Sequence, residues 1–270
     1  ILTNLSEASQ VHMLKMPGGA RFQLTFEKDN ILWLGAATRT ASYDPVDAKF
    51  FIFSKDVGGT ENNQTYRYDF ETGDITRLTD GKSRNSPGRW SNSGRWLAYE
   101  SNRRNKRDTD LYLVDPRDPL SDRLLTIVGG GGWRILDWSP DDSKILVQKY
   151  QSVHESYLWE FDAQTGAAEL IYPKSGLERI SFKYAHYDKD GKNLYVLTDK
   201  DSEFLRLAEL NCATASLRYI SLPITWDVNE MSVSKDRTQI DYTTNENGVS
   251  VLHVYNTLTD QTKTFRNLPP

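Results

Sequence analysis

The chain has little of the chemistry from which disulfide frameworks, metal centres and membrane spans are built. Its 270 residues include one cysteine, Cys212, which excludes an internal disulfide and a cysteine-rich metal cluster. The four histidines have no partner at metal-ligand spacing, so we expect structural histidines and no metal site. No apolar run approaches the roughly 20 residues of a membrane-spanning helix. The formal net charge of −4 argues against nucleic acid, so neither nucleic acid nor a membrane span is expected.

Motifs for cofactors and catalysis are also missing. The glycine run at 129–132 is not followed by Lys-Ser or Lys-Thr, and no helical pattern begins there, which argues against a phosphate cradle. The sequence contains no Gly-x-Ser-x-Gly nucleophile elbow, so we expect no catalytic residue and no cofactor. The first residue is Ile1, and no basic and apolar leader follows it. Either a leader was removed or the chain is a piece of a longer one. The cytoplasm is slightly favoured, and a periplasmic or secreted location stays open.

What the chain does contain is a repeated unit. Each copy runs from an aromatic or apolar residue through Ser or Asp and a short polar turn to Lys or Arg and a strand. Successive copies begin 47, 48, 49 and 46 positions apart. The copies begin at Tyr43, Trp90, Trp138, Tyr187 and Val233. A fixed period of roughly 40–50 residues made of short strands predicts an all-β protein, a β-propeller of four-stranded antiparallel blades.

One unit illustrates the expected blade. Residues 89–90 are typical of the end of an inner strand, and a polar turn leads into a buried second strand over 96–99. A third strand is predicted over 110–115, because its final Asp can start the next turn. A turn over 116–119 then leads to an outer strand over 123–126. Helical periodicity is nowhere sustained, so we expect almost no helix.

The ends of the chain decide the expected number of blades. Second, third and fourth strands are predicted over 1–5, 10–16 and 21–26, and the innermost strand of that first blade is missing. We therefore predict a single propeller domain over 1–270, with one partial blade and five complete ones, as a ring of about six blades or an open arc. The predicted blades cover residues 1–30, 31–80, 81–128, 129–174, 175–222 and 223–270.

Several segments carry a family resemblance. Residues 53–62 contain Asp-Val-Gly-Gly-x-Glu, and residues 77–85 and 101–105 continue the pattern. Together they resemble the propeller of prolyl oligopeptidase-family serine peptidases, with the acylaminoacyl-peptidase and dipeptidyl-peptidase-like members as the nearest relatives. The Trp-Ser-Pro-Asp motif at 138–141 is also similar to the repeats of TolB-like propellers.

This resemblance implies a relative of a peptidase. In that family an α/β-hydrolase domain carries a Ser-Asp-His triad, and the propeller caps it. The present chain has no nucleophile elbow and no strand–helix alternation. The resemblance therefore implies a non-catalytic cap, used for substrate gating or domain docking. Its implied partners are a missing or separate α/β-hydrolase domain and a peptide substrate or protein partner.

Candidate binding residues follow from the geometry of a blade. The loops between second and third strands share one face of a propeller with the connections from an outer strand to the next inner strand. Loops on a rigid scaffold usually carry binding, and Arg and Trp are favoured interface anchors. The alternative is that these side chains satisfy hydrogen bonds between blades. The predicted binding residues of this channel face are Arg84, Arg103, Trp133, Arg134, Glu203, Trp226 and Asp227. The same loops also contain Asp56, Glu61, Glu155 and Asp201.

Three classes of function remain after these observations. The first is the non-catalytic propeller of a serine peptidase, and the second is a free-standing TolB-like propeller that binds a protein. The third is an enzyme with a site in the central channel, such as a lyase or glycosidase. That class needs clustered carboxylates or histidines on the inner strands. The inner strands here mostly contain apolar, Arg and Trp residues, which counts against it.

Overall fold

The computed structural model describes residues 1–3, 7–15, 18–32, 42–174 and 178–266. Within these ranges the chain forms strands and turns without a helix, and every strand pair with a described register is antiparallel. No helix of these ranges could therefore cross a membrane. The chain divides into two compact units, residues 1–135 and 136–270, and each is described by itself. The predicted all-β architecture of antiparallel propeller blades is confirmed.

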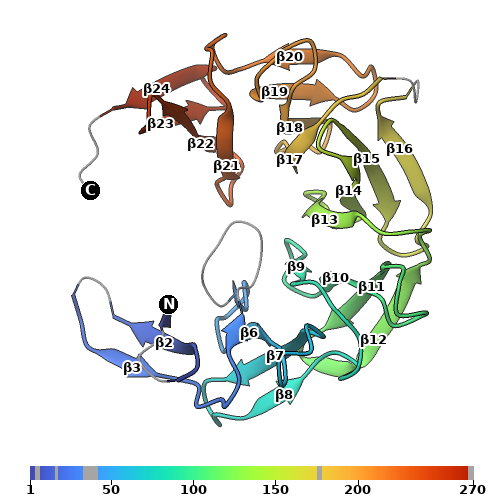
Figure 1. Cartoon of the computed structure of the whole chain (residues 1–270), viewed down its shortest axis with the longest axis vertical. Helices are drawn as coiled ribbons and strands as arrows, with labels where there is room; N and C mark the ends of the chain where they lie inside the picture. The colour runs from blue at the N-terminus through green and yellow to red at the C-terminus, as the bar shows by residue number, and fades with distance from the viewer. Residues whose placement is uncertain (4–6, 16–17, 33–41, 175–177, 267–270) are drawn as a thin grey trace. The chain divides into compact units, whose positions relative to one another are not determined.

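The first unit contains a three-stranded sheet, a five-stranded sheet and a four-stranded sheet (Figure 1). Their strands are β1 (Leu2–Thr3), β2 (Gln10–Leu14), β3 (Arg21–Gln23), β4 (Ile31–Leu32), β5 (Ser42–Tyr43), β6 (Phe50–Lys55), β7 (Gln64–Asp69), β8 (Ile75–Arg77), β9 (Arg89–Trp90), β10 (Leu97–Ser101), β11 (Asp110–Asp115) and β12 (Asp118–Thr126). The three-stranded first sheet agrees with the predicted partial blade. In the second sheet the innermost position is shared by β4 and β5, which both pair with β6.

The second unit contains three four-stranded sheets, and strand β13 runs across the boundary between the units. Their strands are β13 (Trp133–Trp138), β14 (Lys144–Ser152), β15 (Glu155–Asp162), β16 (Ala168–Tyr172), β17 (Phe182–Tyr187), β18 (Asn193–Thr198), β19 (Arg206–Asn211), β20 (Leu217–Tyr219), β21 (Val228–Val233), β22 (Gln239–Glu246), β23 (Val249–Asn256) and β24 (Gln261–Phe265). Each sheet runs in chain order from an innermost to an outermost strand, which is the blade topology expected from the repeat.

Three of the repeats share the same serine-based turn between the first and second strands, at Ser91, Ser139 and Ser234. In the third sheet the Gly94 N–H donates to the carbonyl of Ser91 (2.9 Å), and the Ser91 hydroxyl accepts from the Trp96 N–H (3.1 Å). A left-handed residue then closes the turn, with φ of 69° at Gly94, 59° at Asp142 and 58° at Arg237. This geometry explains why Ser is followed three residues later by Gly or a tolerated polar residue.

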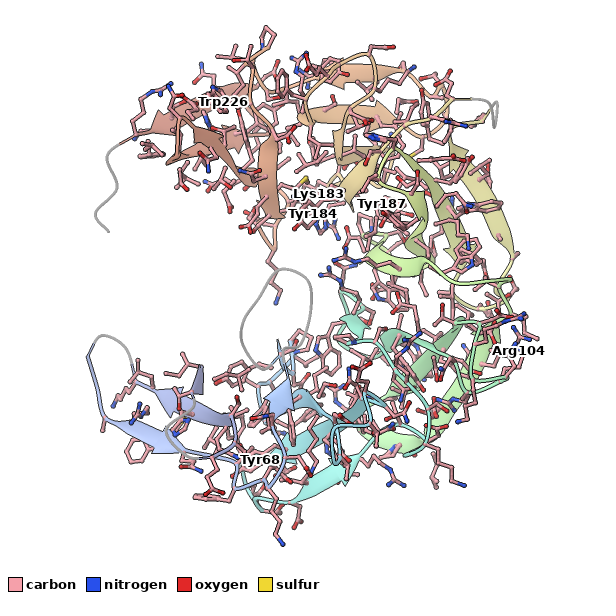
Figure 2. All side chains as sticks on the ribbon, in the orientation of Figure 1. Tyr68, Arg104, Lys183, Tyr184, Tyr187 and Trp226 are labelled. Carbon is pink, nitrogen blue, oxygen red and sulfur yellow. The ribbon has the colours of Figure 1, made fainter. Side chains whose placement is uncertain are left out.

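Aromatic pairs across neighbouring strands form much of the core of the first unit. Phe51 of β6 is fully buried and stacks on Tyr68 of β7, with ring centroids 4.9 Å apart (Figure 2). Phe53 stacks in the same way on Tyr66, at 5.5 Å. These pairs lie directly opposite each other in the β6–β7 register, where cross-strand contacts contribute most to a sheet. The core therefore holds the second and third strands firmly, and the loop that joins them begins and ends at fixed points.

Two details of the sequence prediction are wrong. The turn expected over 116–119 is shorter, because β12 already begins at Asp118 and Pro119 lies inside this outer strand. An outermost strand has one unpaired edge, so the missing N–H of proline is tolerated there. Trp133 and Arg134 were expected just before an inner strand, but both lie within β13. Predicted strand residues Leu5 and Met16 lie outside the described residues.

Candidate functional site

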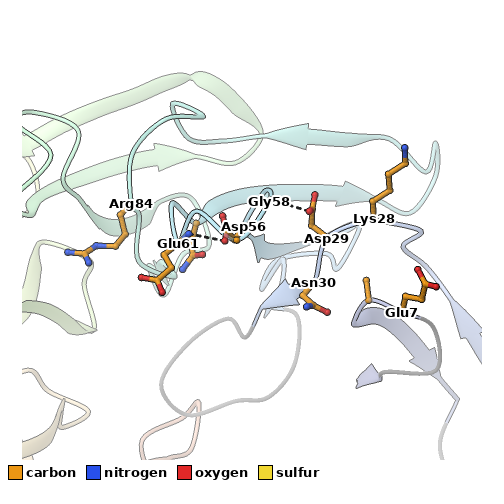
Figure 3. A pocket seen from close by; sticks show the side chains of 11 residues that line it. Glu7, Lys28, Asp29, Asn30, Asp56, Gly58, Glu61 and Arg84 are labelled. Atoms are coloured by element: carbon orange, nitrogen blue, oxygen red, sulfur yellow. Dashed lines mark hydrogen bonds between the residues drawn. The ribbon is translucent and has the colours of Figure 1, made fainter.

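The first unit contains an open cavity of about 560 Å³ on the face where binding was predicted. Its walls come from the β1–β2 loop, the β3–β4 connection, the β6–β7 loop and the β8–β9 connection. The lining residues are Glu7, Ala8, Lys28, Asp29, Asn30, Asp56, Gly58, Gly59, Glu61, Asn63 and Arg84 (Figure 3). Second-to-third-strand loops and outer-to-inner connections thus meet at one site, as expected from the blade geometry.

Side-chain hydrogen bonds shape the β6–β7 loop at this cavity. The Asp56 carboxylate accepts from the Thr60 hydroxyl (2.7 Å) and from the Glu61 N–H (2.8 Å). The N–H of Gly58 donates to Asp29 of the facing connection (3.1 Å), and Figure 3 shows this link together with the one between Asp56 and Glu61. The β6–β7 loop is therefore held by hydrogen bonds within itself and by one bond to the β3–β4 connection.

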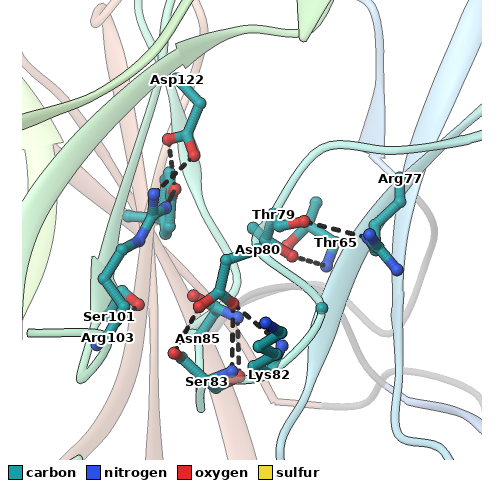
Figure 4. Close-up of polar contacts among 12 residues, drawn as sticks. Thr65, Arg77, Thr79, Asp80, Lys82, Ser83, Asn85, Ser101, Arg103 and Asp122 are labelled. Carbon is teal, nitrogen blue, oxygen red and sulfur yellow. Dashed lines mark hydrogen bonds and ion pairs between the residues drawn. The ribbon is translucent and has the colours of Figure 1, made fainter. Parts of the chain in front are cut away.

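A buried network of amides lies behind the cavity wall (Figure 4). The Asn85 side chain, 3% exposed, donates to the carbonyls of Asn63 (2.9 Å) and Ser83 (2.9 Å). The Gln64 amide donates to the Ser83 carbonyl (2.6 Å) and accepts from the Thr79 hydroxyl (2.7 Å). These bonds join the start of β7 to the β8–β9 connection, so the cavity is formed before any ligand arrives.

A hydrogen bond from a Thr hydroxyl to a Gln side chain also occurs in the first sheet. Gln10 of β2 accepts from the Thr25 hydroxyl at 2.9 Å, and the Thr25 oxygen accepts from the Val11 N–H at 2.9 Å. In both sheets the Gln and Thr are 15 residues apart. This spacing was not predicted from the sequence. The available signal was Gln followed 15 residues later by Thr in two of the repeats.

The charge of the cavity is dominated by carboxylates. Its lining holds four carboxylates and two cations, a formal charge of −2. Partial burial acts against ionisation of Asp56, but hydrogen bonds from the Thr60 hydroxyl and from backbone N–H groups prevail and lower the pKa of this carboxyl. Glu7, Glu61 and Arg84 are exposed. The Oδ1 atom of Asn63 is buried and has no hydrogen-bond partner among the described residues.

Of the predicted binding residues, Arg84 lines this cavity. Its backbone is held on both sides by Asn102, whose Oδ1 accepts from the Arg84 N–H (2.9 Å) and whose N–H donates to the Arg84 carbonyl (3.2 Å). The position of Arg84 is therefore set by the β10–β11 loop, while its side chain reaches solvent.

Arg103 lies in the same unit but is engaged in internal contacts. Its guanidinium pairs with Asp122 at 2.7 Å and lies 4.1 Å from the ring centroid of Tyr112 (Figure 4). Its neighbour Arg104 pairs with the buried Asp110 at 2.6 Å. These contacts lie within one blade, so they hold Arg103 and Arg104 against their own sheet and do not form the bonds between blades named as the alternative.

Trp133 and Arg134 occupy the start of β13. The Trp133 indole N–H donates to the Gly129 carbonyl (2.9 Å), which folds the glycine-rich connection back on the strand. Arg134 is exposed, and its charge acts on the buried carboxyl of Glu100. The cavity lining does not include either residue.

Glu203, Trp226 and Asp227 belong to the second unit, where two loops meet. The Asp227 carboxylate accepts from the Leu205 N–H (2.8 Å), and the Val228 N–H donates to the Leu205 carbonyl (2.9 Å). The β18–β19 loop, which contains Glu203, is therefore fastened to the β20–β21 connection. Trp226 is 36% exposed beside this junction (Figure 2).

A charged cluster in the second unit, at the inner strands and the β21–β22 turn, was not predicted from the sequence. Arg237 donates to Asp137 (2.7 Å) and to the carbonyls of Tyr187 (2.7 Å) and Trp138 (3.1 Å). His186 Nδ1 lies 3.6 Å from the Asp137 carboxylate. Burial would raise the pKa of Asp137, but His186 and Arg237 prevail and hold it well below its usual range. One signal was available, because Asp137 and His186 occupy the same position in successive repeats.

This cluster ties three blades together. Asp137 lies near the end of β13, His186 lies in β17, and Arg237 forms the left-handed turn between β21 and β22. The carboxylate is already neutralised by the guanidinium, whose side chain is 11% exposed. The arrangement is suited to fastening blades rather than to proton transfer. Among the described residues, no group of three or more His, Cys, Asp or Glu side chains is placed to hold a metal ion.

No family model and no curated protein sequence matches the chain. Solved structures do match. A TolB from Acinetobacter baumannii is 16% identical with a TM-score of 0.62, covering 95% of this chain and 59% of its own. A prolyl endopeptidase structure is 15% identical with a TM-score of 0.71, covering 97% of this chain and 40% of its own. An oligogalacturonate lyase from Vibrio parahaemolyticus is 16% identical with a TM-score of 0.73, covering 96% of this chain and 72% of its own.

These similarities show the fold. The chain has the propeller fold found in TolB and in prolyl oligopeptidase-family proteins, as the sequence resemblance implied. It spans 59% of the TolB chain and 40% of the prolyl endopeptidase chain.

Proposed function

We propose that this chain is a non-catalytic β-propeller that binds peptide or protein segments, and that it caps the α/β-hydrolase domain of a serine peptidase. The observation that carries the proposal is the preformed cavity at the β6–β7 loop, on the face predicted from the repeat. The fold similarity to a prolyl endopeptidase supports the proposed setting. In this setting the propeller selects the substrate, and the hydrolase domain supplies the nucleophile.

The ligand of the cavity is inferred from the groups that face it. Glu7 and Glu61 present exposed carboxylates at the cavity. Acceptors of this kind suit the N–H groups of an extended peptide and the side chain of a lysine or arginine. Arg84, which also lines the cavity, suits a peptide carbonyl or carboxylate. The cavity should therefore bind polar peptides and prefer those with a positive charge.

Binding can be measured by fluorescence anisotropy with a labelled polar hexapeptide that contains one lysine. The same peptide with glutamine instead of lysine should bind more weakly by up to about fivefold, the upper end of the effect of one exposed charge pair. The Glu61→Gln variant should remove this preference, whereas Glu71→Gln, an exposed glutamate in the β7–β8 turn, should retain it. Equal binding of both peptides by wild-type protein would contradict the proposed ligand.

The absence of catalysis in this segment has a separate test. A serine-reactive fluorophosphonate probe should leave the chain 1–270 unlabelled, and peptide nitroanilides should not be hydrolysed. If the coding sequence continues beyond residue 270 into a hydrolase domain, the longer product should be labelled. Labelling of the chain 1–270 itself would refute a non-catalytic role.

The second candidate is a free-standing TolB-like propeller that binds a protein partner. The fold similarity to TolB favours it as directly as the peptidase structures favour the first candidate. The coding sequence discriminates between the two. A stop codon directly after residue 270 supports the free-standing propeller, and a downstream Gly-x-Ser-x-Gly elbow supports the peptidase cap.

A further inference from the structure

The second unit has its own cavity, of about 330 Å³, between its last two sheets. One wall is the β20–β21 connection, which contributes Leu222 and Ile224. The other wall is the outer part of the last sheet, β22 to β24 (Figure 1). A volume of this size falls within the range of small-molecule pockets, roughly 300–1,000 Å³. Nothing in the proposed peptide-binding function uses this cavity.

The sheet side of the cavity contains a pair of stacked aromatic rings. Tyr242 of β22 and His253 of β23 are directly opposite in register, and their rings stack at 4.7 Å with planes 8° apart. Thr264 of β24 is the next residue in the same cross-strand row. On the other side of the cavity, Leu222 is 74% exposed. A planar ring between the two walls would remove this apolar surface from water.

The donor and acceptor of each hydrogen bond at the base of the cavity can be assigned. Burial lowers the pKa of His253, so its imidazole is neutral at pH 7 and has one donor and one acceptor nitrogen. The Thr244 hydroxyl donates to Glu246 (3.2 Å), so it accepts from His253 Nε2–H (3.1 Å). His253 Nδ1 then accepts from the Thr264 hydroxyl (3.0 Å). The hydrogen of Thr264 is used, and its oxygen offers only an acceptor to a ligand.

The mouth of the cavity offers hydrogen-bond donors and a positive charge. Arg266 donates to Glu246 at 2.7 Å, and its side chain is 63% exposed, so other N–H groups of the guanidinium reach solvent. Thr264 and Arg266 are two residues apart at the end of an extended strand, a separation of roughly 7 Å on one face. A ligand that satisfies both needs a donor at one end and an anionic acceptor at the other.

We propose that this cavity binds a small planar aromatic acid that carries an N–H or O–H on its ring. The ring lies between the Tyr242–His253 wall and Leu222, its N–H or O–H donates to the Thr264 oxygen, and its carboxylate accepts from Arg266. The proposal is independent of the peptide-binding site, because all of these residues belong to the second unit.

Isothermal titration calorimetry with the whole chain tests this with three probes. Indole-3-propionate has the ring donor and the acid, its naphthalene counterpart lacks the donor, and its methyl ester lacks the charge. We expect indole-3-propionate to bind one to one and each analogue to bind about tenfold more weakly, the usual effect of one lost hydrogen bond. No binding of indole-3-propionate at millimolar concentration, or equal binding of all three probes, would overturn the proposal.

Variants locate the binding on the predicted atoms. In Thr264→Val the advantage of the indole over the naphthalene should vanish, and in Arg266→Gln the advantage of the acid over its ester should vanish. Leu222→Glu should abolish binding of all three probes. Leu258→Glu is the matched control, because Leu258 is 71% exposed in the β23–β24 turn and should leave binding unchanged. Binding that survives Leu222→Glu would show that the probes bind elsewhere and would reject this site.

Discussion

The buried carboxyl of Glu100 is expected to make the first unit less stable as pH rises. Glu100 lies in β10 and is 6% exposed, and its two carboxyl oxygens accept from the Ile135 N–H of β13 and bond the Ser86 hydroxyl. The Ser86 hydroxyl also accepts from the Glu100 N–H at 2.9 Å. The side chain thus joins the third sheet to the next innermost strand, at a place without solvent.

Burial dominates the titration of this group. It raises the pKa of Glu100 from 4.5 to about 7, although the Ile135 N–H and the charges of Arg134 and Arg89 act in the opposite direction. Below pH 4.5 the carboxyl is protonated in both states, and its contribution to stability is fully present. Between pH 4.5 and 7 the unfolded chain ionises while the folded chain does not, so that contribution is lost. At 1.36 kcal/mol per pKa unit, the 2.5-unit difference amounts to about 3 kcal/mol.

The variant Glu100→Gln isolates this effect. A glutamine can still accept from the Ile135 N–H with its oxygen and donate to the Ser86 hydroxyl with its amide nitrogen, but it carries no proton to lose. At pH 4.5 the variant and the wild-type protein should be similarly stable. By pH 8 the variant should exceed the wild type by about 3 kcal/mol in free energy of unfolding.

Urea unfolding followed by tryptophan fluorescence at pH 4.5, 6, 7 and 8 measures the difference between the two proteins. All other titrating groups are common to both, so they cancel. Glu71→Gln, a change at an exposed glutamate, should run parallel to wild type across this range. A difference between Glu100→Gln and wild type that does not change with pH would refute the reasoning.

Three further changes test the packing of the fold. Arg237→Met should lower the free energy of unfolding of the second unit by roughly 3 kcal/mol, because the largely buried carboxylate of Asp137 then loses its guanidinium partner. Adding Asp137→Asn should restore part of that loss. Urea unfolding of the single and double variants measures this, and additive losses would show that the pair is unimportant. Thr79→Val should cost about 1–3 kcal/mol by the same measurement, since it leaves the Thr65 N–H without its acceptor, while Thr76→Val in β8 should cost little. Phe51→Ala, at a fully buried ring, should cost about 3–5 kcal/mol in thermal or urea unfolding, and a loss below 1 kcal/mol would contradict the described core.

Local sequence was sufficient for most of the strands. The third strand predicted over 110–115 matches β11, Asp110–Asp115, because apolar residues run between two polar ends and the final Asp begins a turn. The outer strand that follows was predicted too short. Proline is usually a strand breaker, and its tolerance at Pro119 depends on β12 being the outermost strand of its sheet. The residues of a strand do not by themselves determine whether it lies at the edge or in the middle of its sheet.

The candidate site, too, could be predicted only in part from the local sequence. Arg84 was predicted at a binding face because it follows an outer strand and precedes an inner one, and it lines the cavity of the first unit. Arg103 satisfied the same rule, yet its guanidinium is bound to Asp122 and lies on Tyr112. A loop position can be predicted from the repeat, but whether a charged side chain turns outward depends on the partner within its reach.

The repeat of about 47 residues determined the fold, because its alternation of strands and turns admits a series of antiparallel blades and little else. Turn geometry followed from the same residues, as the left-handed φ of Gly94 shows. Three-dimensional packing decided the rest. Asp137 and Arg237 are 100 residues apart in the chain and 2.7 Å apart in space. Such contacts depend on how blades stack, and each repeat carries information about its own strands but not about the side chains that its neighbours bring to it.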